Sequence, residues 1–259
     1  MEGLPFEYDV NALITAILEG YISTDNLPRG LYLKIAEHLN KGVDEGLGDI
    51  VRSNYAPDKL LQAEMRNNIY MFSGAKTYQQ VRDMSMILAG GADIATFKQV
   101  REAATKVFKT YNVTYLQTEY DTAIGMAQNA RKWNDFERDK ANFDLLEYDA
   151  VMDSNTSDIC RPLDGIRLPV DHPFWNTHSP LNHFNCRCFL RKVIDKMPTN
   201  AQKVQAVSEK VTPKMQDIFK MNPGKDKIVF SEKHPYFDVA PKDRERQKDN
   251  FGLPKPPKP

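Results

Sequence analysis

Apolar residues recur at spacings of three and four through most of the first 145 residues, and this pattern predicts a mainly helical body. Asn11 is a suitable cap for the first helix, and glycines follow the apolar runs where helices are expected to stop. Thr96 and Gln99 have the spacing of a capping box that opens a further helix. The expected helices cover residues 12–19, 31–40, 60–72, 77–89 and 96–111, with stops at Gly20, Gly42, Ser73-Gly74 and Gly90-Gly91.

The clearest helix in the sequence follows a second capping box, formed by Thr114 and Gln117. Its apolar face consists of Leu116, Tyr120, Ala123, Ala127, Ala130 and Trp133, and its other face carries Glu119, Asp121, Gln128, Arg131 and Lys132. We expect the apolar stripe to face the core rather than a partner. The small alanines would allow another helix to approach closely.

The pattern changes near residue 145. Residues 146–152 alternate between apolar and polar, which predicts a half-buried strand. Asp164-Gly165 is a hairpin turn signal before a short apolar stretch. Prolines at positions 169, 173 and 180 then indicate an irregular loop, and residues 186–194 are typical of another strand.

Together these patterns predict an α+β fold, with a mainly helical N-terminal body of long helices followed by a small β-rich module that contains a Pro-rich loop. The expected domains are residues 1–145, 146–200 and 201–259. In the last of them we expect a helix over 203–211, a short strand over 227–230 and an extended, polyproline-like Pro/Lys-rich tail over 250–259.

Composition excludes some functions. Lys plus Arg and Asp plus Glu both number 35, so the formal charge is zero, which argues against a dedicated nucleic-acid coat. The sequence contains no run of about 18 apolar residues, so no membrane span is predicted. Acidic residues stand near the start, where a signal peptide would carry basic ones, so we expect a reducing cytoplasm. In that compartment clustered cysteines favour metal binding or buried thiols over disulfides.

The stretch HFNCRC, residues 183–188, holds two of the three cysteines and one of the five histidines. With Cys160, the residues His183, Cys186 and Cys188 form a set of four donors suited to a structural zinc. However, Cys160 stands alone in the sequence. In a regular strand, the side chains of Cys186 and Cys188 would lie about 7 Å apart, too far for one tetrahedral ion. A cluster of buried thiols with a hydrogen-bonded histidine is the alternative.

Two catalytic interpretations also fit the residue types. Cys160, His183 and Asp164 have the composition of a nucleophile, base and orienting group. A metal-and-histidine nuclease can be composed from Asp171, His172, His178, His183 and Asn185. Arg187 and Arg191 alternate with Cys186, Cys188 and Leu190 and so face away from them, which favours ion pairs or contact with a phosphate backbone.

Three motifs occur in order: D-x6-C-R-P-L-D-G from Asp153, then P-V-D-H-P-F-W, then S-P-L-N-H-F-N-C-R-C. This run resembles the Mu F-like family of phage head morphogenesis proteins, and residues 95–240 carry the resemblance. The matching positions are Asp153, Leu163, Asp164, Gly165, Pro173, Trp175, Pro180 and Arg187, beside the four zinc-ligand candidates. Two positions depart from the family pattern: Ser157 replaces a second cysteine, and Ser179 replaces the first proline of a Pro-Pro pair.

The resemblance implies a minor structural head protein of a tailed phage or prophage, acting at or near the portal in procapsid assembly and in DNA packaging and ejection. The implied partners are the portal protein, the major capsid or scaffolding protein and packaged DNA, with no membrane and no catalytic activity. The implied location is the virion, and the host cytoplasm during assembly. A phage-borne nuclease or toxin that uses the His/Cys cluster is the alternative.

Overall fold

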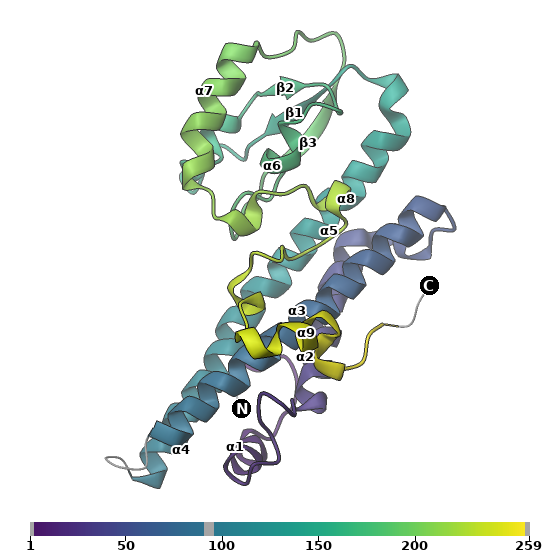
Figure 1. Cartoon of the computed structure of the whole chain (residues 1–259). Helices are drawn as coiled ribbons and strands as arrows, with labels where there is room; N and C mark the ends of the chain where they lie inside the picture. Colours follow the sequence, from purple (N-terminus) through teal and green to yellow (C-terminus); the bar gives the residue numbers. More distant parts are fainter. Residues whose placement is uncertain (1–2, 91–95, 257–259) are drawn as a thin grey trace. The chain divides into compact units, whose positions relative to one another are not determined.

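The computed structural model describes residues 3–90 and 96–256 and has the expected α+β fold, with long helices and a small antiparallel sheet (Figure 1). Its helices and strands are α1 (Val10–Leu18), α2 (Arg29–Leu47), α3 (Ala56–Gly90), α4 (Phe97–Lys109), α5 (Leu116–Asp139), β1 (Leu145–Asp149), β2 (Arg167–Leu168), α6 (Trp175–His178), β3 (Phe189–Val193), α7 (Ala201–Val211), α8 (Pro223–Asp226) and α9 (Arg244–Lys248). The expected helix over residues 203–211 is confirmed as the body of α7.

The chain forms two compact units, each assembled from separated segments. Unit 1 contains residues 1–41, 66–120 and 234–258, and unit 2 contains residues 42–65 and 121–233. The long helices α2, α3 and α5 each contribute to both units. The three-part functional division by residue number remains a prediction.

Some helix boundaries differ from the prediction. Asp9, not Asn11, caps α1, because its Oδ1 accepts hydrogen bonds from the backbone N–H groups of Asn11 and Ala12, both at 3.0 Å. The capping box of Thr96 and Gln99 is confirmed at the start of α4. The second predicted box is wrong. A π-helical segment, Thr110–Tyr115, joins α4 to α5 without a break, so there is no free helix start to cap.

Two glycine signals that were interpreted as helix stops lie inside helices. α2 continues past Gly42 to Leu47, and α3 passes through Ser73-Gly74 without interruption. At Gly74 the physical reason is close packing, because a Cβ atom there would lie 2.0 Å from the Asn250 side chain. Gly46, further along α2, is packed in the same way, since a Cβ atom on it would lie 2.4 Å from the carbonyl oxygen of Ile124 in α5. Glycine serves here as a site of close approach rather than a terminator.

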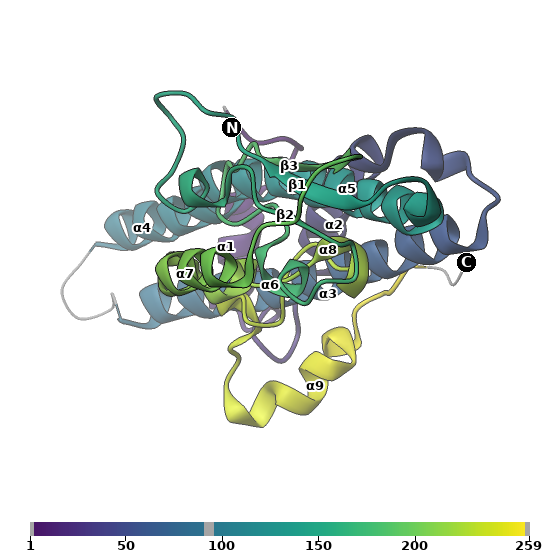
Figure 2. The ribbon, with the colours of Figure 1, turned by 90° about the horizontal axis from the view of Figure 1, so that it is seen from above.

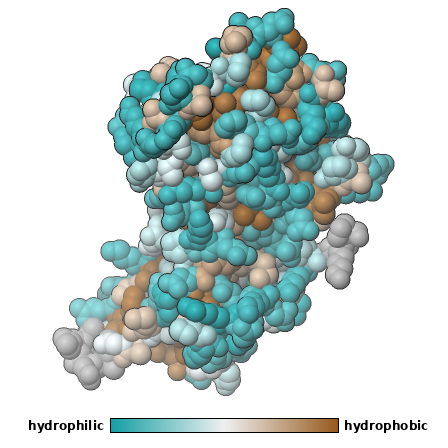
Figure 3. Space-filling view, turned by 45° about the horizontal axis from the view of Figure 1, so that its top comes forward, coloured by the Kyte–Doolittle hydropathy of each residue, from teal (hydrophilic) through white to brown (hydrophobic). Residues whose placement is uncertain are grey.

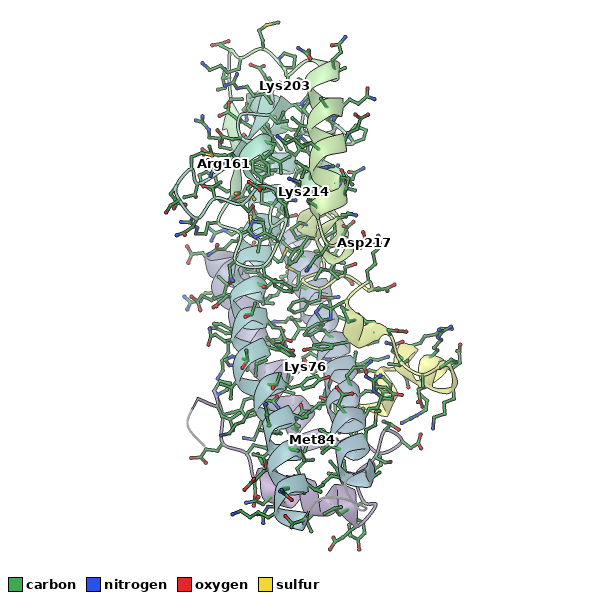
Figure 4. All side chains as sticks on the ribbon, turned by 90° about the vertical axis from the view of Figure 1, so that its left-hand side faces the viewer. Lys76, Met84, Arg161, Lys203, Lys214 and Asp217 are labelled. Atoms are coloured by element: carbon green, nitrogen blue, oxygen red, sulfur yellow. The ribbon has the colours of Figure 1, made fainter. Side chains whose placement is uncertain are left out.

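The predicted apolar stripe of α5 faces the core, with five of its six residues buried and Tyr120 partly buried. Glu119 was placed on the polar face, and this was wrong: it is only 4% exposed. Its carboxylate forms an ion pair with Lys76 of α3, with 2.6 Å between Lys76 Nζ and Glu119 Oε2. Lys76 projects between the long helices in Figure 4.

The residues from 234 to 256, here called the C-terminal segment, pack within unit 1 on buried polar residues of α3. Gln79 Nε2 donates to the carbonyls of Tyr236 and Asp238, each at 2.9 Å. The Tyr236 hydroxyl donates to Glu119 Oε1 at 2.9 Å and so covers the buried ion pair. An apolar cluster of Leu27, Tyr78, Val81 and Val239, joined by Ile22, Phe251 and Leu253, adds to this contact.

The end of the chain is more structured than an extended tail. Asn250–Gly252 forms a short 3-10 helix, and the carbonyl of Pro254 accepts a hydrogen bond from Tyr32. The last three residues of the predicted polyproline-like tail lie outside the described residues. The predicted strand over 227–230 is wrong, because Lys227 adopts a left-handed conformation (φ 55°) directly after α8.

The sheet of unit 2 has the strand order β2-β1-β3, with both pairings antiparallel. Figure 1 shows the sheet between α7 and the last part of α5, and Figure 2 shows the same unit from above, with α7 beside α6. The prediction of a half-buried β1 was wrong, since Leu145 to Tyr148 are all buried. Buried Glu147 is compensated by ion pairs with Arg167 of β2 and Arg191 of β3.

Asp164-Gly165 does not form a two-residue hairpin. A longer loop joins β1 to β2, and Gly165, with φ 70°, returns the chain so that its N–H donates to the carbonyl of Tyr148 at 2.9 Å.

Hydrophilic side chains cover much of the face shown in Figure 3. No helix in the described part of the chain combines the length and apolar character needed to cross a bilayer.

Candidate metal centre

The sheet register brings the two cysteine-bearing loops together. Asp149 at the end of β1 pairs with Phe189 at the start of β3. The loop that follows β1 leads to Cys160, and the loop that precedes β3 contains residues 183–188. These loops therefore leave neighbouring strands at the same end of the sheet. Cys186 and Cys188 lie before β3, so the separation expected within a regular strand does not apply to them.

Three of the four predicted ligands converge within unit 2. Cys160 Sγ lies 3.2 Å from His183 Nε2 and 3.6 Å from Cys186 Sγ. All three donor atoms lie within 4.8 Å of one another. In a tetrahedral zinc site, two sulfurs are separated by about 3.8 Å and a sulfur and an imidazole nitrogen by about 3.5 Å, from the usual bond lengths. The donor types and spacings fit zinc.

Cys188 lies beside this group. It is not part of the three-donor set, but its thiol interacts with both Cys160 and Cys186. Its side chain is buried, at 6% exposure. Cys188 is therefore the one predicted ligand outside the three-donor set, and it lies next to that set.

The His183 ring is held in one orientation. Its Nδ1 lies 2.7 Å from the carbonyl oxygen of Phe184, a pair in which the ring N–H donates and the carbonyl accepts. That bond leaves Nε2 directed toward Cys160 and the Ser157 hydroxyl, which lies 2.9 Å away. The Cys160 sulfur and the Phe184 carbonyl raise the pKa of His183. A carbonyl behind a ligating imidazole is the usual way to fix its tautomer.

The three thiols of the cluster differ in pKa. Hydrogen bonds from Cys186 and Cys188 lower the pKa of Cys160 well below its ordinary value, with His183 contributing further. The Cys160 sulfur in turn raises the pKa of Cys186 to about 11 and also raises the pKa of Cys188. The pKa values of the three thiols are therefore linked through Cys160, the sulfur common to the short contacts with His183 and Cys186.

Tyr148 and Asn182 contact the cluster and each other through hydrogen bonds. Neither was among the predicted site residues. The Tyr148 hydroxyl lies 3.5 Å from Cys160 Sγ and donates to Asn182 Oδ1 at 2.7 Å. Burial raises the pKa of Tyr148, so the hydroxyl remains a donor. The inward-facing position of Tyr148 in the strand pattern was the available signal; Asn182 gave none.

The motif residues Asp153 and Arg187 form an ion pair across the rim of the cluster, with 2.7 Å between Asp153 Oδ1 and the guanidinium. The Arg187 hydrogen bond lowers the pKa of Asp153 to about 2, and the N–H of Asn155 assists. Arg191 also pairs with carboxylates, Glu147 and Asp149. Both arginines thus support the ion-pair interpretation.

The other motif positions have varied environments. Leu163 and Trp175 are fully buried, and the Trp175 Nε1–H donates to the carbonyl of Pro169 at 3.0 Å. Pro180 is buried, whereas Pro173 is exposed. These residues shape the loops around the cluster rather than contribute ligands.

The two catalytic arrangements are not assembled. Asp164 accepts a hydrogen bond from the N–H of Ala150 at 3.0 Å, and the Phe184 carbonyl takes the orienting position behind His183. His178 is buried against Thr212 and Phe174, at 3.1 Å from the Thr212 hydroxyl. Among residues 3–90 and 96–256, the cluster of potential metal ligands consists of Cys160, His183 and Cys186. Asp171, His172 and His178, which the nuclease interpretation requires, are not part of it.

A small cavity of about 20 Å³ adjoins the cluster. Its walls include Cys160, His183 and Cys188, together with Ser157 and Arg187. This volume is sufficient for one ion or one water-sized molecule. Two of the three converging donors, Cys160 and His183, therefore line a space of the right size for a single ligand.

The fold and site define an α+β protein whose small sheet carries two loops held together by a Cys/His cluster. Residues 73–191, slightly under half of the 259-residue chain, match the family model described as Phage Mu protein F like protein. The matched region runs from within α3 into β3 and includes the whole cluster, and it confirms the family resemblance.

This match supports a phage head morphogenesis protein. The resemblance over residues 95–240 extends beyond this match, which ends at residue 191. No curated protein and no solved structure matches the chain.

Proposed function

We propose that this chain is a minor head protein of a tailed phage or prophage that acts at or near the portal during procapsid assembly and DNA packaging or ejection. The observation that carries the proposal is the family match over residues 73–191, which spans the long helices and the β module together. The portal protein and the major capsid or scaffolding protein are the proposed partners.

Deletion of the gene from its phage tests this proposal. We expect fewer filled heads, lower infectivity, and co-purification of the tagged wild-type chain with portal or procapsid. Normal particle yield and infectivity after deletion would exclude it. The nuclease or toxin alternative would instead appear as slower host growth on expression, relieved by His183→Ala, and as DNA cleavage with added divalent metal.

We also infer that unit 2 holds one zinc ion, with Cys160, His183 and Cys186 as ligands and Cys188 as the fourth. The donor types, the 3.6 and 3.2 Å separations, the fixed imidazole and the cavity support this assignment. A zinc ion there would supply a cross-link between the two loops. Removing it is expected to leave the loops without their shared anchor while the sheet persists.

Elemental analysis of freshly purified protein is the direct test. We expect one zinc per chain, lost in Cys160→Ser and in Cys186→Ser. Arg161→Ala changes an exposed residue that borders the cluster without supplying a ligand, and it should retain the metal. Wild-type protein without metal, with the same circular dichroism as a zinc-treated sample, would leave packed thiols as the explanation.

The DNA-contact part of the proposal is supported by a basic surface on α4. A cavity of about 560 Å³ there is lined by Lys98, Arg101, Glu102, Thr105, Lys106 and Lys109. Four positive charges and one negative charge on one helix suit a phosphate backbone, although the chain as a whole is neutral.

Charge-reversal variants test whether DNA binds to this surface of α4 or responds only to the net charge of the chain. Lys98→Glu with Lys109→Glu should weaken binding to duplex DNA and reduce the salt dependence by about two phosphate contacts. The matched control, Lys203→Glu with Lys210→Glu on α7, makes the same charge change in unit 2. Equal losses in both variants would show that α4 has no special role.

A further inference from the structure

The sulfurs of the metal centre are close enough to react with each other. Cys160 and Cys186 are both buried free cysteines, and their Sγ atoms lie 3.6 Å apart. A disulfide requires about 2.05 Å, so closure needs a movement of about 1.5 Å. Both residues lie on loops rather than within strands, where such a movement does not break a sheet hydrogen bond.

The two sulfurs differ in access. Cys160 lines the cavity of about 20 Å³, whereas Cys186 does not. Hydrogen peroxide is only slightly larger than the water molecule that such a cavity can accept. An oxidant that enters this cavity can therefore reach Cys160, and the Cys186 sulfur lies 3.6 Å from the Cys160 sulfur.

We propose that Cys160 and Cys186 form a reversible disulfide when hydrogen peroxide reaches this cavity, so that oxidation replaces the metal centre by a covalent link between the same two loops. In the first step the Cys160 sulfur attacks one peroxide oxygen. The O–O bond breaks, an S–O bond forms, and the thiol proton leaves with the other oxygen as water.

In the second step the Cys186 sulfur attacks the Cys160 sulfenic acid. The S–S bond forms, the S–O bond breaks, and the oxygen leaves as a second water with the Cys186 thiol proton. The two thiols lose two electrons and the peroxide gains them, so the reaction is balanced. A thiol reductant reverses it by exchange.

Cys188 also lines the cavity, so it is the competing reactant. A link from Cys186 to Cys188 would close a ring with only Arg187 between the two cysteines, which strains the disulfide geometry. The 3.6 Å separation of the Cys160 and Cys186 sulfurs favours that pair, so Cys188 is the thiol expected to stay reduced, and a Cys160–Cys188 link is the competing outcome of the test. The disulfide proposal concerns the same residues as the proposed metal centre. It rests on that centre only for the expected release of zinc.

The experiment uses the full chain after treatment with EDTA. Hydrogen peroxide is added, free thiols are alkylated, and the peptides are mapped by mass spectrometry. Two of the three thiols should be lost, with a Cys160–Cys186 linked peptide that dithiothreitol removes. Cys188→Ser should form the same link and Cys160→Ser should form none. Three alkylated thiols, or a link that includes Cys188, would overturn the proposal.

A second arm keeps this result distinct from the metal question. In zinc-loaded protein, each disulfide formed should release one zinc. If the chain never binds zinc but forms the link, the metal centre fails and this inference stands. If zinc binds and neither sample forms the link, this inference fails alone. Should a cysteine variant fail to fold, the wild-type peptide map still decides the outcome.

Discussion

At the scale of single residues, Lys76 and Glu119 show where pattern-based prediction fails. Glu119 was assigned to the solvent face of an amphipathic helix, and no prediction was made for Lys76, yet both side chains are buried and paired. Burial lowers the pKa of Lys76, and Glu119 opposes that change by stabilising the cation. Lys76 Nζ also donates to the carbonyl of Tyr111, inside the π-helical segment. The π-helical geometry and the buried cation thus occur at the same place.

Removing one member of this pair should be costly. Glu119→Gln would leave the Lys76 cation buried without its counterion, and we expect a loss of about 3–5 kcal/mol in the free energy of unfolding. Urea denaturation measures this. The double variant Lys76→Met with Glu119→Gln should lose much less than the sum of the two single changes. Additive losses would show that the two groups are not coupled.

Asp153 offers a residue-scale test of pH dependence. Its folded pKa, about 2, lies below the unfolded value of about 3.9, so its stabilising contribution is present above about pH 4 and is lost as the pH falls toward 2. In Arg187→Gln the pKa of Asp153 should rise toward about 3.9, as measured by carboxyl NMR titration. Asp217, whose pKa is lowered by Lys220, should not change.

At the scale of elements, α3 is one helix where the sequence predicted two. Its interruption was expected at Ser73-Gly74, because glycine is a frequent helix terminator. The partner that explains the glycine, Asn250, lies far along the chain, and a single sequence without that contact gives no sign of it. The existence of helices, the capping box of α4 and the stripe of α5 were predictable because they depend on local spacing.

Gly74 should therefore resist even the smallest substitution. Gly74→Ala would normally favour a helix, but its Cβ would meet the Asn250 side chain, so we expect a loss of about 1–3 kcal/mol in thermal or urea unfolding. Gly30→Ala in α2, with open space around it, is the control and should be neutral or slightly stabilising. Adding Asn250→Gly should reduce the effect of Gly74→Ala; an unchanged effect would contradict the proposed clash.

The candidate site was predictable as a set of residue types but not as a geometry. The four soft ligands and the Asp153–Arg187 motif positions follow from the sequence and from the family resemblance. Their convergence depends on the pairing of Asp149 with Phe189 and on β3 starting after Cys188, neither of which local patterns specify. Tyr148 and Asn182 support the cluster through long-range contacts only.

At the scale of the whole molecule, the two units depend on different parts of the chain. A chain that ends at Lys233 would lose the Tyr236, Asp243 and Asn250 contacts of unit 1 but keep every segment of unit 2. We expect faster hydrogen exchange in the half of α3 that belongs to unit 1 and unchanged exchange in the sheet. Equal protection of α3 in both chains would show that the C-terminal segment contributes little.

The position of Tyr236 has a consequence for synthesis on the ribosome. Lys76 and Glu119 both emerge early, but the residue that covers them follows more than a hundred residues later. At roughly 5–20 residues per second, the growing chain carries this charged pair uncovered for several seconds. Unit 1 is completed only after residues 234–256 have been made. A partner that binds its finished surface therefore meets chains that extend at least to these residues, and a translation product that stops before them would lack that surface.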